Sequence, residues 1–196
     1  MEHATRRAIL NSPLYLMEFK HLGVIGLLKD VLVTRNIDLE YGQEPSRLLC
    51  SLVRLYMLRP DRSIVHEILS ARGFAYATAF AAIHVRSYWS SLDIHKALTP
   101  LLNNYTKIRV SGLKALGLQG HVPLDVFVEA LLHQPSTLST CSGTFTPMGC
   151  LRLPLLTKRE LFELSGKLRP FSEELQEMLR EKAAENGSHA EMDVVS

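Results

Sequence analysis

Residues 74–85 contain no charged side chain, and five of them are alanine. A helix that is apolar on every side is usually buried in the middle of a domain, because no face of it suits water. The small alanine side chains also let neighbouring backbones approach closely. The sequence therefore predicts a central helix over 74–88, around which the other elements pack.

Apolar residues at helical spacing predict further helices on both sides of this central one. Prolines and capping residues mark their ends, because proline suits the first turn of a helix and the residue before a proline leaves the helical region. Gly23 and Gly26 indicate a bend in the first of these helices. The polar segment 36–44 is expected to be a loop. The predicted helices run over 13–34, 45–59, 61–73, 90–98, 124–133, 157–168 and 171–185.

The stretch LTPLLNNYTKIRV, which starts at Leu98, begins with helical spacing and ends with strand-like alternation. Pro100 would cost about 3 kcal/mol in a helix interior. We therefore expect Thr99 to cap a new short helix that has Pro100 at its first position. The glycine-containing loop that follows favours a small hairpin over about 106–124, with Pro123 at its end or edge. This hairpin is predicted to be the only β structure.

These elements predict a mainly α fold, an irregular multi-helix globular domain with one small β-hairpin. A single domain is expected over 1–185. Within it, residues 134–150 are rich in Ser, Thr, Gly and Pro, and predict a mobile insertion. Residues 186–196 have the composition of a disordered tail.

The charge balance argues against a dedicated electrostatic binder of nucleic acid. The net charge is only +2, whereas such proteins carry a dense basic patch. The sequence has three cysteines, Cys50, Cys141 and Cys150, and none of them forms a CxxC pair. This odd number and the lack of a signal peptide predict free thiols in a reducing compartment. No apolar run is long enough to suggest a membrane-spanning helix.

No motif in the sequence predicts catalysis, a metal or a cofactor. The eight histidines do not show the spacing of a zinc site, and phosphate-binding and nucleophile motifs are absent. His84 lies in the apolar central helix and is expected to be a core histidine whose hydrogen bonds are satisfied. Cys50 has leucines on either side and is also expected in the core.

Two groups of aromatic and basic residues are candidates for binding. Tyr105, Lys107 and Arg109 start the hairpin, and Arg86, Tyr88 and Trp89 end the central helix. Such groups can stack on bases or grip a peptide. The competing interpretation is structural: Tyr105 would close a helix seam, and Trp89 would pack at a helix junction.

The hairpin region also carries a family resemblance. "SSLDIHKALTPLLNNYTKIRV", followed by "GHVPLDVFVEALLH", resembles the pre-mRNA-splicing factor 38 family. "SPLYL" and "LLCSLVRLYMLRPDRSIVHEIL" resemble earlier segments of the same family, in the same order. The matching positions of the hairpin region are Leu98, Pro100, Leu101, Asn103, Tyr105, Lys107, Ile108, Asp125, Phe127, Leu131 and Leu132.

The resemblance implies a nuclear, non-catalytic interaction scaffold of the spliceosome. It implies association with the tri-snRNP and the B complex, and a need for the protein in spliceosome activation during pre-mRNA splicing. The implied partners are other B-complex proteins, namely a microfibril-associated splicing factor and a zinc-finger splicing protein. Two alternatives stay open: a single-stranded RNA-binding module that uses Tyr105, Lys107 and Arg109, and an enzyme whose site no motif reveals.

Short helices that meet at angles leave grooves, and grooves of this kind bind helical or extended peptides. The partner-binding residues expected from their positions are Tyr56 and Arg59, at the end of the Leu-Cys helix, and Lys107 and Arg109, on the hairpin.

Overall fold

The computed structural model describes residues 3–39, 44–71, 73–113, 118–133, 155–173 and 177. Contacts divide the chain into two compact units, residues 1–156 and 157–196, and each is described by itself. The insertion predicted over 134–150 and the tail predicted over 186–196 lie outside the described residues. The single domain predicted over 1–185 stays a prediction.

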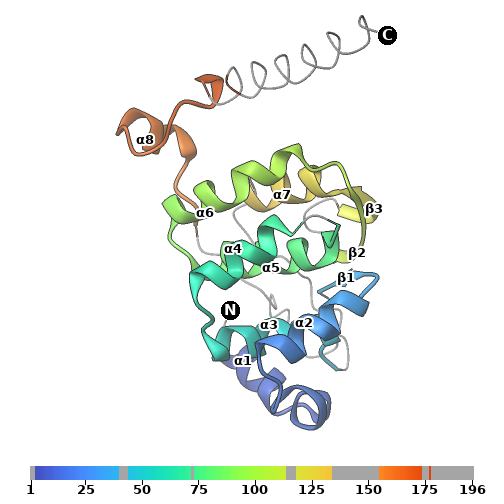
Figure 1. The fold of residues 1–196 in the computed structure, drawn as a ribbon. Coiled ribbons are helices and arrows are strands. Elements are labelled where there is room, and N and C mark those ends of the chain that lie inside the picture. The colour runs from blue at the N-terminus through green and yellow to red at the C-terminus, as the bar shows by residue number, and fades with distance from the viewer. Residues whose placement is uncertain are drawn as a thin grey trace, which may run out of the picture. The chain divides into compact units, whose positions relative to one another are not determined.

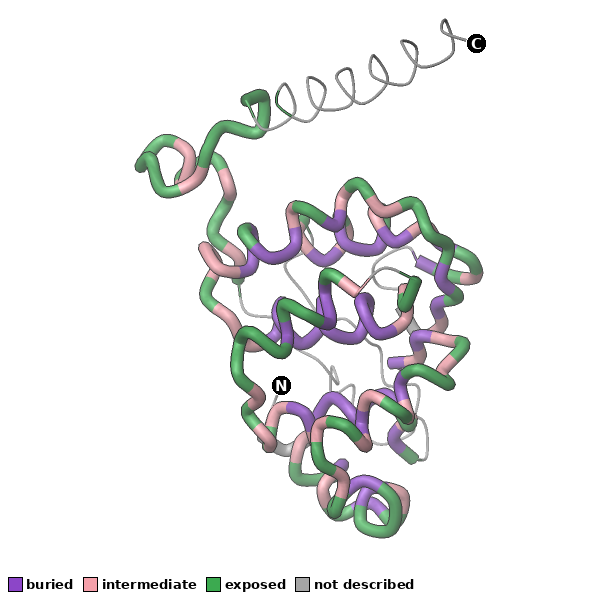
Figure 2. The backbone as a smooth tube through the Cα atoms, viewed as in Figure 1, coloured by how far each residue is buried: buried purple, intermediate pink, exposed green. Residues whose placement is uncertain are grey.

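The central helix of the first unit is α5 (Ala75–Tyr88), and every residue from Ala77 to Ser87 in it is buried. This confirms the prediction made from its uncharged, alanine-rich sequence. Figure 2 shows the buried residues along α5 and on the sides of its neighbours that face inward. The helices that pack against α5 are α2 (Val24–Val33), α3 (Arg47–Leu58), α4 (Arg62–Ser70), α6 (Ser91–Leu98) and α7 (Leu124–His133).

The predicted first helix is divided into two pieces (Figure 1). A short π-helix, η1 (Tyr15–Phe19), comes first, and α2 follows after Gly23, whose backbone is extended (φ −85°, ψ −179°). The expected bend is therefore confirmed at Gly23, while Gly26 lies inside α2. A further helix, α1 (His3–Leu10), was not predicted from the sequence, because it has too few apolar residues to show a periodic pattern.

Serine caps fix the starts of two helices. The Ser46 hydroxyl accepts a hydrogen bond from the Leu49 N–H at 3.3 Å and donates one to the Asp38 carbonyl at 2.8 Å. Ser90 likewise accepts from the Asp93 N–H at 3.3 Å at the start of α6. Asp61 holds the N-cap position of α4, but its side chain makes no capping hydrogen bond.

The expectation that Thr99 caps a new helix is wrong. Thr99 has helical dihedral angles (φ −55°, ψ −42°), and its hydroxyl donates to the His95 carbonyl one turn back at 2.6 Å. The chain passes directly from α6 into a 3₁₀-helix, η2 (Thr99–Asn103). Pro100 explains the change, because it has no N–H to continue the α-helical bonding beyond Thr99.

The predicted hairpin is confirmed. Strands β2 (Lys107–Leu113) and β3 (Leu118–Pro123) pair antiparallel, and Lys107 lies opposite Pro123. Pro123 is therefore the last residue of the ladder, where its missing N–H does little harm.

The hairpin is not the only β structure, so that part of the prediction is wrong. A two-residue strand, β1 (Ile37–Asp38), pairs parallel to β2, with Ile37 opposite Val110. It lies in the segment expected to be a polar loop, where Ile37 and Leu39 alternate and are both fully buried. The Asn36 side chain also donates to the Ser111 hydroxyl at 2.8 Å, which holds this register.

The second unit contains α8 (Arg159–Leu164), which confirms part of the helix predicted over 157–168. Gly166 has a positive φ of 69° just after this helix. Arg159 pairs with Glu163 at 2.6 Å, and the same carboxylate accepts from the Phe171 N–H. The helix predicted over 171–185 lies largely outside the described residues. Within the described part of the chain, no helix is both long and apolar enough to cross a membrane.

Candidate functional site

Two side chains of chemically reactive types, Cys50 and His84, lie in the core of the first unit. Burial raises the pKa of the Cys50 thiol to about 12, so the thiol stays protonated and is a poor nucleophile. Burial lowers the pKa of His84 to about 4, so its imidazole is neutral at physiological pH. The prediction that both are core residues is confirmed. His84 is less well satisfied than expected, because its Nδ1 has no hydrogen-bond partner among the described residues.

Trp89 packs at a helix junction, as the structural interpretation predicted. The Arg62 guanidinium lies 5.0 Å from the centre of the indole, and the His66 ring meets it edge-on at 5.1 Å. Arg62 also donates to the Asp93 carboxylate at 2.8 Å. Trp89 therefore ties the end of α5 to α4, and Arg62 links α4 to α6.

Tyr56, the first predicted partner-binding residue, is half-buried and engaged within the domain. Its ring stacks on the Tyr88 ring at 4.3 Å between centroids, and the Arg6 guanidinium lies 4.8 Å from its centre. Arg59, the second, is exposed at the end of α3. Its φ of 46° is the left-handed conformation that glycine adopts most readily.

Lys107 and Arg109, the other two predicted residues, are exposed on β2 and point away from the core. The strand alternates, so Ile108 and Val110 between and beyond them are buried. The Tyr76 hydroxyl accepts from the Arg109 N–H at 3.1 Å, which holds this strand against the start of α5.

The structure does not bring the four predicted residues together. Tyr56 and Arg59 belong to the end of α3, whereas Lys107 and Arg109 belong to the hairpin. In Figure 1 the connection from α3 to α4 and the hairpin lie on opposite sides of the first unit.

Tyr105 corrects the structural interpretation of the hairpin region. Its side chain is 67% exposed and therefore closes no helix seam. It precedes Lys107 and Arg109 at alternate positions along extended chain, so all three side chains are available to a partner.

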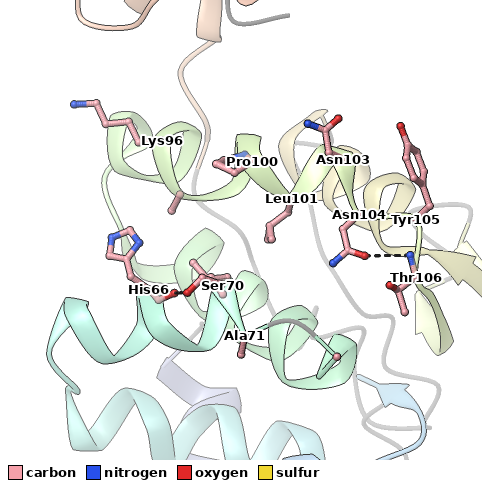
Figure 3. Close-up of a pocket in the computed structure, with 13 residues that line it drawn as sticks. His66, Ser70, Ala71, Lys96, Pro100, Leu101, Asn103, Asn104, Tyr105 and Thr106 are labelled. Atoms are coloured by element: carbon pink, nitrogen blue, oxygen red, sulfur yellow. Dashed lines mark hydrogen bonds between the residues drawn. The ribbon is translucent and has the colours of Figure 1, made fainter. Parts of the chain in front are cut away.

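A pocket of about 660 Å³ lies beside Tyr105, and we call it the α4–η2 pocket (Figure 3). Its apolar floor comes from Leu69 of α4, Ala97 of α6 and Leu101 of η2, all buried. Polar and exposed side chains surround this floor. They are His66, Ser70, Lys96, Asn103, Asn104, Tyr105 and Thr106.

The chain from α6 through the hairpin, which forms one side of this pocket, lacks negative charge, whereas Glu67 lies on α4 on the other side. No Asp or Glu lies between Asp93 and Asp125, whereas Lys96, Lys107 and Arg109 do lie there. The nearly neutral net charge of the whole chain therefore hides a locally cationic segment.

Sequence reasoning missed the pocket because its walls come from segments far apart in the chain. His66, Ser70 and Lys96 showed no motif, and helical spacing alone does not reveal which helix ends approach one another. The run without carboxylates after Asp93 was the available signal.

Among the described residues, no three His, Cys, Asp or Glu side chains are grouped as metal ligands. The first unit is a helical domain that presents a pocket between α4 and η2 and a strand face with exposed Lys107 and Arg109. The family model described as the PRP38 family matches residues 1–147. The chain belongs to the PRP38 family.

Individual relatives agree with this assignment. "Pre-mRNA-splicing factor 38" of Schizosaccharomyces pombe is 36% identical over 91 residues, which are 43% of this chain and 43% of that protein. "Pre-mRNA-splicing factor 38A" of Xenopus laevis is 26% identical over 176 residues, covering 86% of this chain and 52% of the relative. The chain therefore spans about half the length of the curated relatives it matches.

A solved structure shares the fold. A chain in the crystal structure of the Snu23-Prp38-MFAP1(217-258) complex of Chaetomium thermophilum aligns with a TM-score of 0.72 and 23% sequence identity. The alignment covers 94% of this chain and 93% of that chain.

Proposed function

We propose that this chain is a non-catalytic protein-interaction scaffold of the spliceosome, acting in the nucleus in pre-mRNA splicing. The observation that carries the proposal is membership of the PRP38 family over residues 1–147. Within this function, the chain would associate with the tri-snRNP in the B complex and be needed for spliceosome activation.

The proposed partners are a microfibril-associated splicing factor and a zinc-finger splicing protein. Support comes from the complex that holds the structural relative, which contains Prp38, Snu23 and a segment of MFAP1. A short segment fits a domain of this kind, because helices meeting at angles offer grooves to a linear peptide.

Arg59, Lys107 and Arg109 are the proposed anchors for these partners. All three are exposed, and they form no ion pair with another described residue. Tyr56 remains a candidate only through the part of its ring that Tyr88 and Arg6 leave open. Docked segments lose entropy on ordering, so a few such anchors should dominate the binding energy.

Titration calorimetry with segments of the two partners from the same organism tests these anchors. Replacing Arg59 and Arg109 together by Glu should weaken binding by about tenfold or more, because each change removes a proposed cationic anchor and puts a negative charge in its place. Lys29→Glu with Arg35→Glu is the matched control, since it changes net charge equally at exposed positions in and just after α2. Equal loss in both variants, or none in either, would remove Arg59 and Arg109 from the proposal.

Single-stranded RNA binding is the second candidate function. The exposure of Tyr105 beside Lys107 and Arg109 favours it, because an aromatic face with flanking cations is how many proteins hold unpaired bases. RNA affinity should then fall steeply with salt concentration, and Tyr105→Ala should weaken it. Saturable binding of a partner segment at moderate salt, with weak RNA binding, would favour the scaffold.

A further inference from the structure

We propose that the α4–η2 pocket binds a short acidic segment of a partner protein and takes one aliphatic side chain of that segment onto its floor. The proposal rests on the scaffold function and deepens it, because it names a site and the chemistry of its occupant.

The floor explains the aliphatic side chain. Leu69, Ala97 and Leu101 present apolar surface at the bottom of the pocket. Figure 3 shows the Leu101 side chain pointing into the space between η2 and α4. The volume of about 660 Å³ exceeds that of one aliphatic side chain, so the backbone that carries it can enter as well. Covering this floor removes apolar surface from water, which favours binding.

The Asn104 side chain offers a hydrogen bond to such a backbone. Its Oδ1 accepts from the Thr106 N–H at 3.1 Å, which fixes the orientation of the amide. Its Nδ2 lies on the side away from Thr106 (Figure 3), and no described residue accepts from it. A fixed donor on the wall of an apolar pocket suits a peptide carbonyl, because placed polar groups give such sites their specificity.

Charge explains why the segment should be acidic. Lys96 lies at one end of the pocket, and Lys107 follows Tyr105 and Thr106 at the other end. Neither lysine forms an ion pair with another described residue. Among the described residues, no Asp or Glu lines the pocket. A segment with carboxylates on both sides of its aliphatic residue would complement this pattern.

The same features favour a peptide over RNA. Tyr105 is the only Phe, Tyr or Trp among the described lining residues, whereas a path for single-stranded RNA usually offers several rings to successive bases. The aliphatic floor and the fixed amide match a side chain and its backbone better than a base and its phosphate.

Selection of a phage-displayed library of random short peptides on the full chain tests the proposal. We expect the selected peptides to share one Leu, Ile, Val or Met with Asp or Glu on both sides. Their affinities, measured by fluorescence anisotropy on synthetic peptides, should fall by about tenfold or more in the double variant Lys96→Glu with Lys107→Glu. Ser70→Trp should have a similar effect, because an indole at this exposed rim position would fill the pocket without disturbing the core.

The matched control is Lys20→Glu with Lys29→Glu, two exposed lysines near the start of the chain that do not line the pocket. It changes net charge equally and should leave the affinity unchanged. Circular dichroism and thermal melting of every variant separate loss of binding from loss of fold.

The proposal is overturned by selected peptides without acidic residues, by binding that survives Ser70→Trp, or by failure of the folded protein to select any peptide. Oligouridylate that binds more tightly than the peptides, and is lost in the same variants, would assign the surface to RNA. Capture of splicing proteins from nuclear extract distinguishes this failure from failure of the scaffold function. If Ser70→Trp captures them as well as the wild type does, the pocket proposal is rejected and the scaffold function is kept.

Discussion

Arg86 on α5 donates a hydrogen bond from its Nε to the backbone carbonyl of Leu131 on α7 at 2.7 Å. The arginine is fully buried, and burial lowers its pKa, although a guanidinium in a protein still keeps its charge. Leu131 lies in the last turn of α7, where carbonyls have no partner within the helix. A buried side chain of the central helix therefore caps the end of its neighbour.

Because of this bond, two substitutions of Arg86 should lower the free energy of unfolding by different amounts. Arg86→Met keeps much of the buried stem but leaves the Leu131 carbonyl without this donor, which should lower the free energy of unfolding by about 1–3 kcal/mol. Arg86→Ala also opens a cavity and should cost more. Urea unfolding of the two variants measures both values. Equal losses would show that the stem contributes nothing, and no loss would show that the bond does not stabilise the domain.

Phe80 should be a core residue in energetic terms as well. Its side chain is fully buried in α5, so Phe80→Ala should lower the free energy of unfolding by about 3–5 kcal/mol through lost apolar burial and a new cavity. Phe74, just before the same helix, is 53% exposed and offers a matched control. Phe74→Ala should cost clearly less. A thermal melt that hardly changes for Phe80→Ala would contradict its place in the core.

His84 should make stability depend on pH. Its folded pKa of about 4 lies below its usual value of 6.5, so the unfolded chain takes up a proton first as pH falls. The contribution of neutral His84 to the free energy of unfolding is fully present above pH 6.5. It is lost as the pH falls toward 4, by on the order of 3 kcal/mol.

His84→Leu removes this titration while keeping the site apolar. Urea unfolding at neutral pH and at about pH 4.5 should show a smaller acid loss in the variant than in the wild type. Parallel losses in the two proteins would mean that His84 titrates normally in the folded state.

Arg59 ends α3 in the left-handed conformation, which should strain its backbone. A side chain in the left-handed conformation costs roughly 1–2 kcal/mol, which glycine avoids at the expense of unfolded-state entropy. Arg59→Gly should therefore raise the free energy of unfolding slightly or leave it unchanged, while partner binding falls. Arg59→Ala keeps the strain and loses the charge, so it separates the two effects. A clear destabilisation by Arg59→Gly would show that the arginine side chain stabilises the turn.

The sequence predicted those parts of the fold that depend on local chemistry. The uncharged run of α5 and the glycine-containing hairpin each have a signal within a few neighbouring residues. Strand β1 did not, because only two residues pair and their partner in β2 lies far along the chain. Thr99 was assigned wrongly because the residue before a proline usually leaves the helical region, whereas Thr99 keeps helical dihedral angles.

The binding surface was predicted only in part. Exposure of Lys107 and Arg109 follows from strand alternation, whereas exposure of Tyr105 depends on where η2 ends. The α4–η2 pocket requires α4, α6 and η2 to be placed together, and no short-range pattern encodes that placement. Arg86 was a binding candidate, and that expectation is wrong, because the structure buries it fully. A charged side chain is rarely expected at full burial, so the sequence did not indicate this place.

The scaffold function is tested most directly by purifying the tagged chain from nuclear extract treated with ribonuclease, followed by quantitative proteomics. We expect the microfibril-associated splicing factor and the zinc-finger splicing protein to stay bound at moderate salt after the RNA is destroyed. Tri-snRNP proteins should be enriched in the untreated sample. Loss of every splicing protein on ribonuclease treatment, or their absence from both samples, would contradict a protein-interaction scaffold.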